Sequence, residues 1–382
     1  MASPIDQTPL GLEPGGLVLH IGVHKTGTTA IQAALANSRP ILGQWQIRYP
    51  GNQQAHRLVA SSAMNRRLGW RVGGAPAPDP DLWNQFVTEA HAFKGVTVCS
   101  SEFFAEASDE VAQGIVDRVG AERMHVVVTL RNLGRILPSA WQQILKSGYE
   151  TGYEPWLHQI FAPTVVEPKP QTFWNRHRHD QVVQRWAQLV GSARMTVVVV
   201  DDSQPDEIYR NFESLLGLPE RTLSDNRLES ANRSMTLAEA EFLRQLNVAL
   251  GGGAGWKRYG NQVHDALIKG MIETRVPTGD EARMQTPQWA LDRAAEFADV
   301  YVEAIRASGV NVVGDLAILS KRLQGPDAID SEGSSDMPTA AAITALLSAL
   351  DASRPQTDQP PQARLRKLAK KLQADRSSKR RT

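Results

Sequence analysis

The chain has almost no cysteine, almost no net charge and no long apolar run. Its one cysteine, Cys99, excludes an intrachain disulfide, and the apolar setting VTVCS predicts a buried, inert thiol. The net charge is +1, so the composition indicates no general attraction to nucleic acid. No apolar run approaches the roughly 20 residues that span a bilayer, and the N-terminus lacks the pattern of a signal peptide. We therefore expect a cytoplasmic protein without a transmembrane segment.

The chain does contain a regular alternation of short apolar runs with amphipathic segments. Nearly continuous apolar runs, rich in β-branched residues, predict buried parallel strands at 17–21, 96–99, 125–130 and 195–200. Helical patterns occur between these runs, at 82–93, 109–119 and 181–190. The alternation predicts an α/β fold, with a P-loop-type parallel β-sheet flanked by helices on both faces.

Composition divides the chain into three parts. Residues 1–16 are rich in Pro and Gly and are predicted to be disordered. Residues 17–324 form the predicted domain, which becomes mainly helical after Leu237. Residues 325–382 combine a Gly/Ser/Asp/Pro-rich linker with a basic tail, and we expect them to be largely disordered. The tail has the charge to contact anionic lipid or nucleic acid, but its narrow apolar stripe favours a solubilising role.

The segment LVLHIGVHKTGTT, residues 17–29, joins a predicted strand to a predicted helix. Such a junction directs backbone N–H groups and the positive end of a helix dipole toward one point, which predicts a bound phosphate or similar oxyanion. Gly22, Gly27 and Thr29 match the P-loop pattern G-x-x-x-x-G-K-[ST], although an ordinary turn without a ligand can also match it. However, Thr28 occupies the lysine position of that pattern, and Lys25 comes three residues earlier.

The segment HVVVTLRNLGRILPSAWQQ, residues 125–143, predicts a second anion site by the same logic. We expect the strand to end at Leu130 and Pro138 to open a helix that carries Ser139 in its first turn. Arg131 supplies a planar donor fork and Ser139 a hydroxyl, and the two together can hold one phosphate. The alternatives are that Arg131 pairs with a carboxylate and that Ser139 only caps its helix.

Together, HKTGTT (24–29) and the pair Arg131 and Ser139 resemble the sulfotransferases that use 3′-phosphoadenylyl sulfate, PAPS. In that family a P-K-x-G-T-T loop holds the 5′-phosphosulfate and an R-x(7)-S pair holds the 3′-phosphate. The resemblance runs from Leu17 to about Leu218 and includes the R-N-P-x-x-R-x-x-S-x-W-Q pattern of bacterial members, with Arg135, Trp141 and Gln142 at matching positions. It implies PAPS as co-substrate, PAP as product and no metal, with the co-substrate bound by His24, Lys25, Thr26, Gly27, Thr28, Thr29, Arg131 and Ser139.

The resemblance also implies roles in catalysis. Lys25 would contact the bridging oxygen, where negative charge grows as the sulfuryl group is transferred. The base that removes the acceptor's proton would be Glu102, which follows the strand at 96–99 where the family places its base. His56 is the alternative, because an unperturbed imidazole pKa of about 6.5 suits a base without further tuning.

The acceptor would be a hydroxyl or amine of a small molecule, carbohydrate or lipid, with a preference for carbohydrate or glycolipid that comes from the bacterial members. Candidate acceptor contacts are the aromatic and polar residues of 149–156, 174–179 and 256–259. The chain departs from the family where His24 and Leu133 replace prolines and where Ala30 replaces an adenine-stacking tryptophan. The adenine contact is therefore not assigned.

Two rival functions remain open at this stage. A P-loop kinase or NTPase requires a lysine next to Thr29, which the chain lacks, and a metal-binding acid. Asp201 and Asp202 follow a strand and could provide that acid, although we expect a structural or capping role for them. The second rival is a noncatalytic nucleotide-binding protein.

Overall fold

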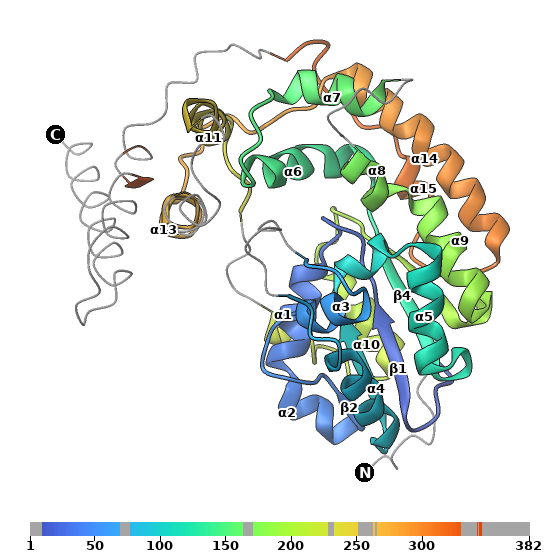
Figure 1. Ribbon diagram of the computed structural model, residues 1–382. Helices are drawn as coiled ribbons and strands as arrows, with labels where there is room; N and C mark the ends of the chain where they lie inside the picture. The colour runs from blue at the N-terminus through green and yellow to red at the C-terminus, as the bar shows by residue number, and fades with distance from the viewer. Residues whose placement is uncertain are drawn as a thin grey trace, which may run out of the picture.

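The computed structural model describes residues 10–68, 77–162, 171–227, 233–250, 263, 266–329, 342, 344 and 345. Within them, a six-stranded, all-parallel sheet has the order β2-β3-β1-β4-β5-β6 (Figure 1). The strands are β1 (Gly16–His20), β2 (Ile47–Arg48), β3 (Val96–Ser100), β4 (Met124–Leu130), β5 (Met195–Val199) and β6 (Asn311–Val313). The expected α/β fold and its four longer strands are confirmed, each to within one residue at either end. β2 and β6 are too short to give an apolar pattern.

Helices connect and cover the strands, and those expected at 82–93, 109–119 and 181–190 are confirmed as α4, α5 and α9. The α-helices are α1 (Thr28–Asn37), α2 (Arg39–Leu42), α3 (Arg57–Ala63), α4 (Leu82–Ala92), α5 (Asp109–Val119), α6 (Leu133–Leu145), α7 (Tyr153–Phe161), α8 (Gln171–His177), α9 (His179–Val190), α10 (Glu207–Leu216), α11 (Leu237–Leu250), α13 (Lys269–Thr274), α14 (Gln288–Ser308) and α15 (Ala317–Ser320). The 3-10 helices are η1 (Gly43–Trp45), η2 (Glu102–Glu106), η3 (Ala121–Arg123), η4 (Ser192–Arg194) and η5 (Ser224–Asn226).

Alternate residues of each strand face two different apolar cores. Leu17 and Leu19 of β1 pack in a core with residues of α3, α4, α5, α9 and α14. Val18, between them, packs in a second core with residues of α1, α2 and α10. This two-residue period explains why the strands read as continuous apolar runs, because helices cover both faces of the sheet.

The strand order changes direction at β1. The chain passes from β1 outward to β2, returns to β3 beside β1, and then crosses to β4 on the other side of β1. Ligands of open parallel sheets bind beyond the carboxyl ends of the strands at such a switch point. The loop that follows β1, residues 21–27, therefore lies where the fold is best suited to hold a ligand.

A third core belongs to a helical layer beyond that edge of the sheet. It joins apolar residues of α6, α7, α8, α11, α13 and α14. Figure 1 shows α6 crossing beyond the carboxyl ends of β1 and β4. The expected helical C-terminal part is confirmed by α11, α13, α14 and α15.

The helix that carries Ser139 begins earlier than the sequence predicts. α6 starts at Leu133, because the side chain of Asn132 accepts a hydrogen bond from Gly134 N–H at 3.0 Å and caps the helix. Pro138 therefore lies inside α6, where its ring removes one intrahelical hydrogen bond without ending the helix. Ser139 is in the second turn, not the first.

The ends of the folded region also differ from the expected boundaries. Leu12 is 1% exposed and packs in the core with α1 and α10, so the folded chain begins before Leu17. At the other end, Gly325 donates its N–H to Gln288 Oε1 at 2.9 Å, so the chain still contacts α14 after residue 324. Residues 1–9 and most of the expected linker and basic tail lie outside the described residues.

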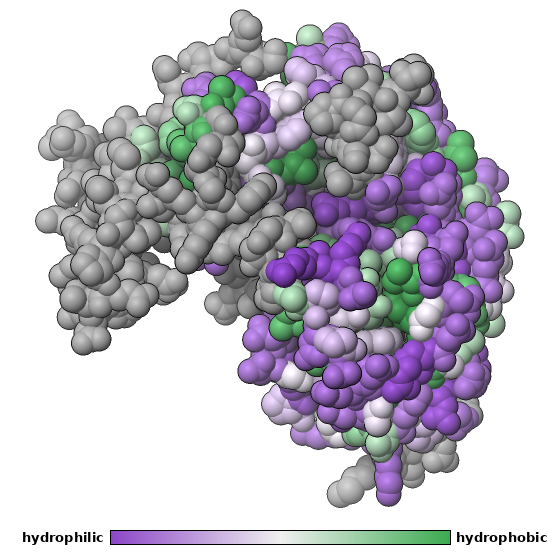
Figure 2. Space-filling model, in the orientation of Figure 1, coloured by the Kyte–Doolittle hydropathy of each residue, from purple (hydrophilic) through white to green (hydrophobic). Residues whose placement is uncertain are grey.

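The described surface that faces the viewer in Figure 2 is mostly hydrophilic, and its hydrophobic residues form separate small patches. In the described part of the chain, no helix combines the length and the apolarity needed to cross a bilayer.

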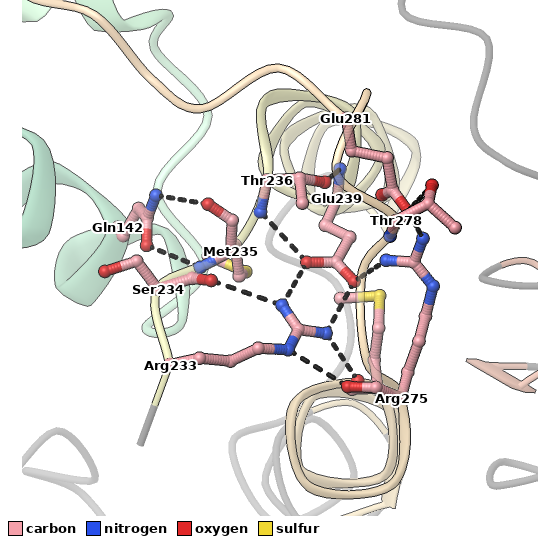
Figure 3. A network of polar contacts seen from close by, with 10 residues as sticks. Gln142, Arg233, Ser234, Met235, Thr236, Glu239, Arg275, Thr278 and Glu281 are labelled. Atoms are coloured by element: carbon pink, nitrogen blue, oxygen red, sulfur yellow. Dashed lines mark hydrogen bonds and ion pairs between the residues drawn. The ribbon is translucent and has the colours of Figure 1, made fainter. Parts of the chain in front are cut away.

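Gln142 and Glu239 fix the segment before α11 to the rest of the helical layer (Figure 3). The Gln142 side chain donates to Met235 O and accepts from Met235 N–H, both at 3.0 Å. The fully buried Glu239 carboxylate pairs with Arg233 at 2.6 Å and with Arg275. Burial opposes ionisation of Glu239, but hydrogen bonds from Arg233, Thr236 N–H and Arg275 outweigh it and lower its pKa.

We expect Glu239→Ala to lower the free energy of unfolding by about 3–5 kcal/mol, because it removes the buried counter-charge of Arg233 and one of the two carboxylates that pair with Arg275. The matched control is Glu241→Ala on the same helix, which removes a partly exposed pair with Arg244 and costs at most about 1 kcal/mol. Urea unfolding of the three proteins measures both values. Equal losses in the two variants would contradict the role assigned to Glu239.

Candidate functional site

The loop after β1 turns sharply through residues with positive φ. Gly22, Lys25 and Gly27 have φ of 49°, 68° and 83°. A Cβ at Gly22 would lie 2.7 Å from Thr28 Oγ1, so only glycine fits there. Gly27 is the N-cap of α1, and no side chain caps this helix end. The loop therefore directs the uncapped N-terminus of α1 toward the switch point of the sheet.

A buried chain of polar groups holds the loop on the strand ends. Thr26 Oγ1 donates to Val23 O at 2.8 Å and lies 2.7 Å from Thr129 Oγ1 in β4. His20 at the end of β1 lies 3.4 Å from the same Thr129 hydroxyl and 2.8 Å from Ser100 Oγ in β3. Burial lowers the pKa of His20 to about 3, so this ring is neutral. Thr26 and His20 thus join the loop to β1, β3 and β4.

Lys25 extends from the loop toward α6. Its Nζ donates to Gln143 Oε1 at 2.9 Å. Burial and the positive charges of Lys146 and Arg176, partly offset by the Glu102 carboxylate, together lower the pKa of Lys25 to about 8. The arrangement brings several cations together around one ammonium group, so the position favours a bound anion.

Arg131 reaches the same loop from the end of β4. Its Nη1 donates to Lys25 O at 3.3 Å, and its Nε and Nη2 contact the Asp202 carboxylate at 3.0 and 2.6 Å. The carboxylate pairing that the sequence left open for Arg131 is therefore present. Arg135 also lies near this carboxylate, at 3.9 Å.

Ser139 lies one turn before Gln143 on α6, on the face that meets Lys25. Its hydroxyl donates to Ile136 O at 2.9 Å, a bond within the helix. Trp141 and Gln142, which matched the sequence pattern, have structural contacts. Trp141 is buried and donates from its indole to Thr151 O at 3.1 Å, while Gln142 holds the segment before α11.

The remaining loop residues differ in exposure. Thr28 is buried and its hydroxyl donates to Val23 O at 3.3 Å, whereas Thr29 is exposed. His24 lies beside η2, with Nε2 2.7 Å from Glu106 Oε1. Any contact that Thr28 makes to an anion would therefore come from its backbone N–H, unless its hydroxyl rotates away from Val23.

The two candidate bases occupy different environments. Glu102 is the first residue of η2 and accepts a hydrogen bond from Gln32 Nε2 at 3.2 Å. His56 is buried, with Nδ1 accepting from Ser100 N–H at 3.1 Å and Nε2 3.0 Å from Pro50 O. Burial lowers the pKa of His56 to about 4. Both ring nitrogens of His56 are therefore engaged with backbone, whereas Glu102 keeps an oxygen for another partner.

Glu106 forms a charge cluster that the sequence did not single out. Its carboxylate contacts His24, Arg66 and Arg176 at 2.7, 2.7 and 2.9 Å. Burial by itself would raise the pKa of Glu106, but the His24 hydrogen bond and the two arginines outweigh it and lower the pKa to about 2. This cluster joins the loop to η2 and α8, elements that are separate in the sequence.

A small pocket opens beside Lys25 between the loop and the helical layer. The loop and the helices α6, α7 and α8 supply its lining, namely His24, Lys25, Ala140, Gln143, Ile144, Trp156, Phe173, Arg176 and His177. Trp156 and His177 come from 149–156 and 174–179, two of the three segments expected to contact an acceptor. The third, 256–259, lies outside the described residues.

Asp201 and Asp202 have the structural roles expected of them. Asp201 Oδ1 accepts hydrogen bonds from Ser203 N–H and Ser203 Oγ at 2.8 and 2.7 Å, and Asp202 pairs with Arg131. Among the residues that the structure describes, no group of three or more His, Cys, Asp or Glu side chains could hold a metal. Cys99 is fully buried in β3, and burial raises the pKa of its thiol.

Comparison of the chain with protein-family models, with curated proteins and with solved structures finds no match.

We expect Lys25→Met to raise the free energy of unfolding at pH 7 by about 1–2 kcal/mol. The folded pKa of Lys25, about 8, lies below the ordinary lysine value of 10.5, so the unfolded state binds more protons between these pH values. The contribution of Lys25 to the free energy of unfolding therefore rises with pH between about 8 and 10.5. At pH 7 the charged ammonium destabilises the folded protein. Urea unfolding at pH 7 and pH 10 measures the difference, which should shrink at pH 10.

The control is Lys94→Met, which removes an exposed lysine and should change stability by less than about 0.5 kcal/mol. If Lys25→Met is instead less stable than the parent at pH 7, the charged Lys25 ammonium does not destabilise the folded protein.

Proposed function

We propose that this protein is a sulfotransferase that moves a sulfuryl group from PAPS to a hydroxyl or amine acceptor. The observation that carries the proposal is the convergence of the two anion motifs on Lys25. Arg131 contacts the Lys25 carbonyl, and Gln143, one turn after Ser139, contacts the Lys25 ammonium. These motifs are about a hundred residues apart in the chain, and the fold supports reading them as one site at the switch point of the sheet.

In this proposal the loop and the N-terminus of α1 hold the 5′-phosphosulfate, and Lys25 contacts its bridging oxygen. The acceptor oxygen or nitrogen forms a bond to sulfur while the bond from sulfur to the bridging oxygen breaks. The electron pair of the broken bond stays on the phosphate of PAP, where Lys25 stabilises the growing negative charge. The acceptor's proton passes to a base, so the products are the sulfated acceptor, PAP and one proton.

Glu102 is the proposed base and His56 is the weaker candidate. Glu102 lies at the carboxyl end of β3, close enough to Lys25 for its charge to affect that ammonium. His56 has both ring nitrogens in hydrogen bonds to backbone groups and a pKa of about 4, so it would have to break a bond to accept a proton.

Arg131 is the proposed ligand of the 3′-phosphate, in exchange for Asp202. The Arg131 fork that now holds the Asp202 carboxylate has the planar geometry that also binds phosphate. Arg135 lies near the same carboxylate and would balance it after the exchange. A P-loop kinase would not need Arg131 to bind a 3′-phosphate. The chain also has Thr28 where such a kinase has the lysine that contacts the triphosphate.

We expect PAP to raise the melting temperature of the protein and ATP at the same concentration to have almost no effect. Charge-assisted contacts to the 3′-phosphate contribute about 1.5–3 kcal/mol each, and ATP cannot make them. Thermal unfolding with PAP, ATP and 3′-dephosphorylated PAP measures the preference. Arg131→Lys should reduce the shift with PAP, because one ammonium cannot form the bidentate contact. Equal stabilisation by ATP would contradict the proposal.

The protonated Lys25 ammonium attracts the phosphate of PAP, whereas the neutral amine does not. The affinity for PAP should therefore fall as the pH rises through about 8. Calorimetric titration between pH 6.5 and 9.5 measures this dependence. The Lys25→Met protein should bind PAP weakly over the whole range and show a much flatter profile. A parent profile that also stays flat would exclude Lys25 from the site.

We expect Glu102→Gln to lower the rate of sulfuryl transfer by at least about 10²-fold, because the amide cannot accept the acceptor's proton. His56→Gln should keep the rate within about threefold of the parent once folded protein is compared, since a group with both nitrogens bound has no part in proton transfer. Transfer from labelled PAPS in an acceptor screen measures both rates. The reverse order of effects would make His56 the base.

A further inference from the structure

A buried amide on α1 holds the carboxylate of Glu102. Gln32 is 3% exposed, and its Nε2 donates a hydrogen bond to Glu102 Oε2 at 3.2 Å. Glu102 is the first residue of η2, at the carboxyl end of β3 and 70 positions later in the sequence. The contact therefore ties η2 to the helix whose N-terminus follows the loop.

Glu102 also lies against the loop itself. A Cβ at Gly22 would lie 3.4 Å from Glu102 Cβ. The Glu102 charge acts on Lys25, where it opposes the lowering of the lysine pKa by burial and by nearby cations. The loop, α1 and Glu102 thus meet at one place, so a side chain that fixes Glu102 relative to α1 also fixes it relative to an anion at the N-terminus of α1.

The group that holds Glu102 is neutral, in contrast to the partners of Glu106 on the same 3-10 helix. Glu106 contacts His24 and two arginines, which outweigh burial and lower its pKa to about 2. In the part of the chain that the structure describes, Glu102 has only the Gln32 amide as a hydrogen-bond donor to its side chain. An amide orients a carboxylate without a full counter-charge, and a full counter-charge would make that carboxylate a weak base.

The contact occupies one carboxylate oxygen and leaves the other. Glu102 Oε1 accepts no hydrogen bond from the described residues, and it is not among the buried side-chain atoms that lack a partner. It can therefore be reached from outside the protein. A base needs such an oxygen within hydrogen-bond reach of the proton that it removes.

We propose that Gln32 is a positioning residue for proton transfer, which holds Oε2 of Glu102 so that Oε1 faces the acceptor. The inference rests on the proposed function, because Glu102 acts as a base only if an acceptor loses its proton beside the loop. It assigns to α1 a second task, since the helix that binds the phosphosulfate through its N-terminus also sets the position of the base through Gln32.

The test measures release of PAP from labelled PAPS by the full-length protein, with an acceptor library and with water alone as the acceptor. In the water reaction, the water oxygen bonds to sulfur while the bridging bond breaks and leaves its electron pair on PAP. One water proton passes to Glu102, so the products are hydrogen sulfate and PAP. Calorimetry with PAP measures binding separately from these rates.

We expect Gln32→Met, which keeps the length of the side chain and removes the donor, to lower kcat at least about tenfold, because a misplaced base lies outside its productive geometry. The KM for PAPS and the Kd for PAP should stay within about threefold of the parent values. If Gln32→Met does not fold, Gln32→Glu keeps the shape of the amide, replaces the donor with an acceptor, and should give the same pattern.

A double-mutant cycle separates positioning from a purely structural role. In the Glu102→Gln background, Gln32→Met should change kcat by less than about twofold, because no base is left to position. A purely structural role would lower kcat by the same factor in both backgrounds, as expected for independent sites. The matched control is Asn37→Met, which removes another side-chain amide of α1, bonded to Asn226 O at 2.9 Å, and should leave kcat unchanged.

The outcomes distinguish this inference from the proposed function. If PAP binds and the parent releases PAP from PAPS, but Gln32→Met keeps its kcat or lowers it equally in both backgrounds, Gln32 does not position the base and the proposed function stands. A loss of PAP affinity that matches the loss of kcat would show that Gln32 supports the loop instead, which also overturns the inference. If the parent neither binds PAP nor consumes PAPS, the proposed function is wrong and the role of Gln32 falls with it.

Discussion

The short hydrogen bonds that join Thr26 with Val23 and Thr129 are the constraint on which the rest of the site depends. They fold the loop back onto β4, while His20 joins the same cluster to Ser100 in β3. With the loop fixed in this way, Lys25 is held at positive φ and its side chain turns toward α6. A change in this buried cluster would move the lysine, although none of its members contacts the pocket.

Positive charge is concentrated around the loop, and the fold tolerates it through a few acidic partners. Glu106 balances His24, Arg66 and Arg176, and Asp202 balances Arg131. Lys25 has an amide oxygen as its direct partner, and its pKa is low because the ammonium is buried and lies near further cations. The negative charge of the proposed co-substrate would remove this imbalance, so the same feature that lowers stability would raise affinity.

Much of the fold could be predicted because its signals are local. The runs that became β1, β3, β4 and β5 are long enough to show burial on both faces, whereas β2 and β6, with two and three residues, are not. Pro138 was misleading, because Asn132 caps the helix earlier and the missing N–H of a proline costs one bond without ending the helix. The Glu106 cluster could not be predicted, since its partners come from three distant segments.

The sequence by itself determined the alternating α/β order, the glycine positions of the loop and the residue types able to bind an anion, since each depends on neighbours within one element. Only the tertiary structure decided what those residues meet. It placed Gln143 on Lys25 across 118 positions of sequence, occupied Arg131 with Asp202, and buried His177, whose Nδ1 has no hydrogen-bond partner among the described residues. Such contacts depend on how α6 and α8 pack beyond the carboxyl ends of the strands, and no local pattern encodes that packing.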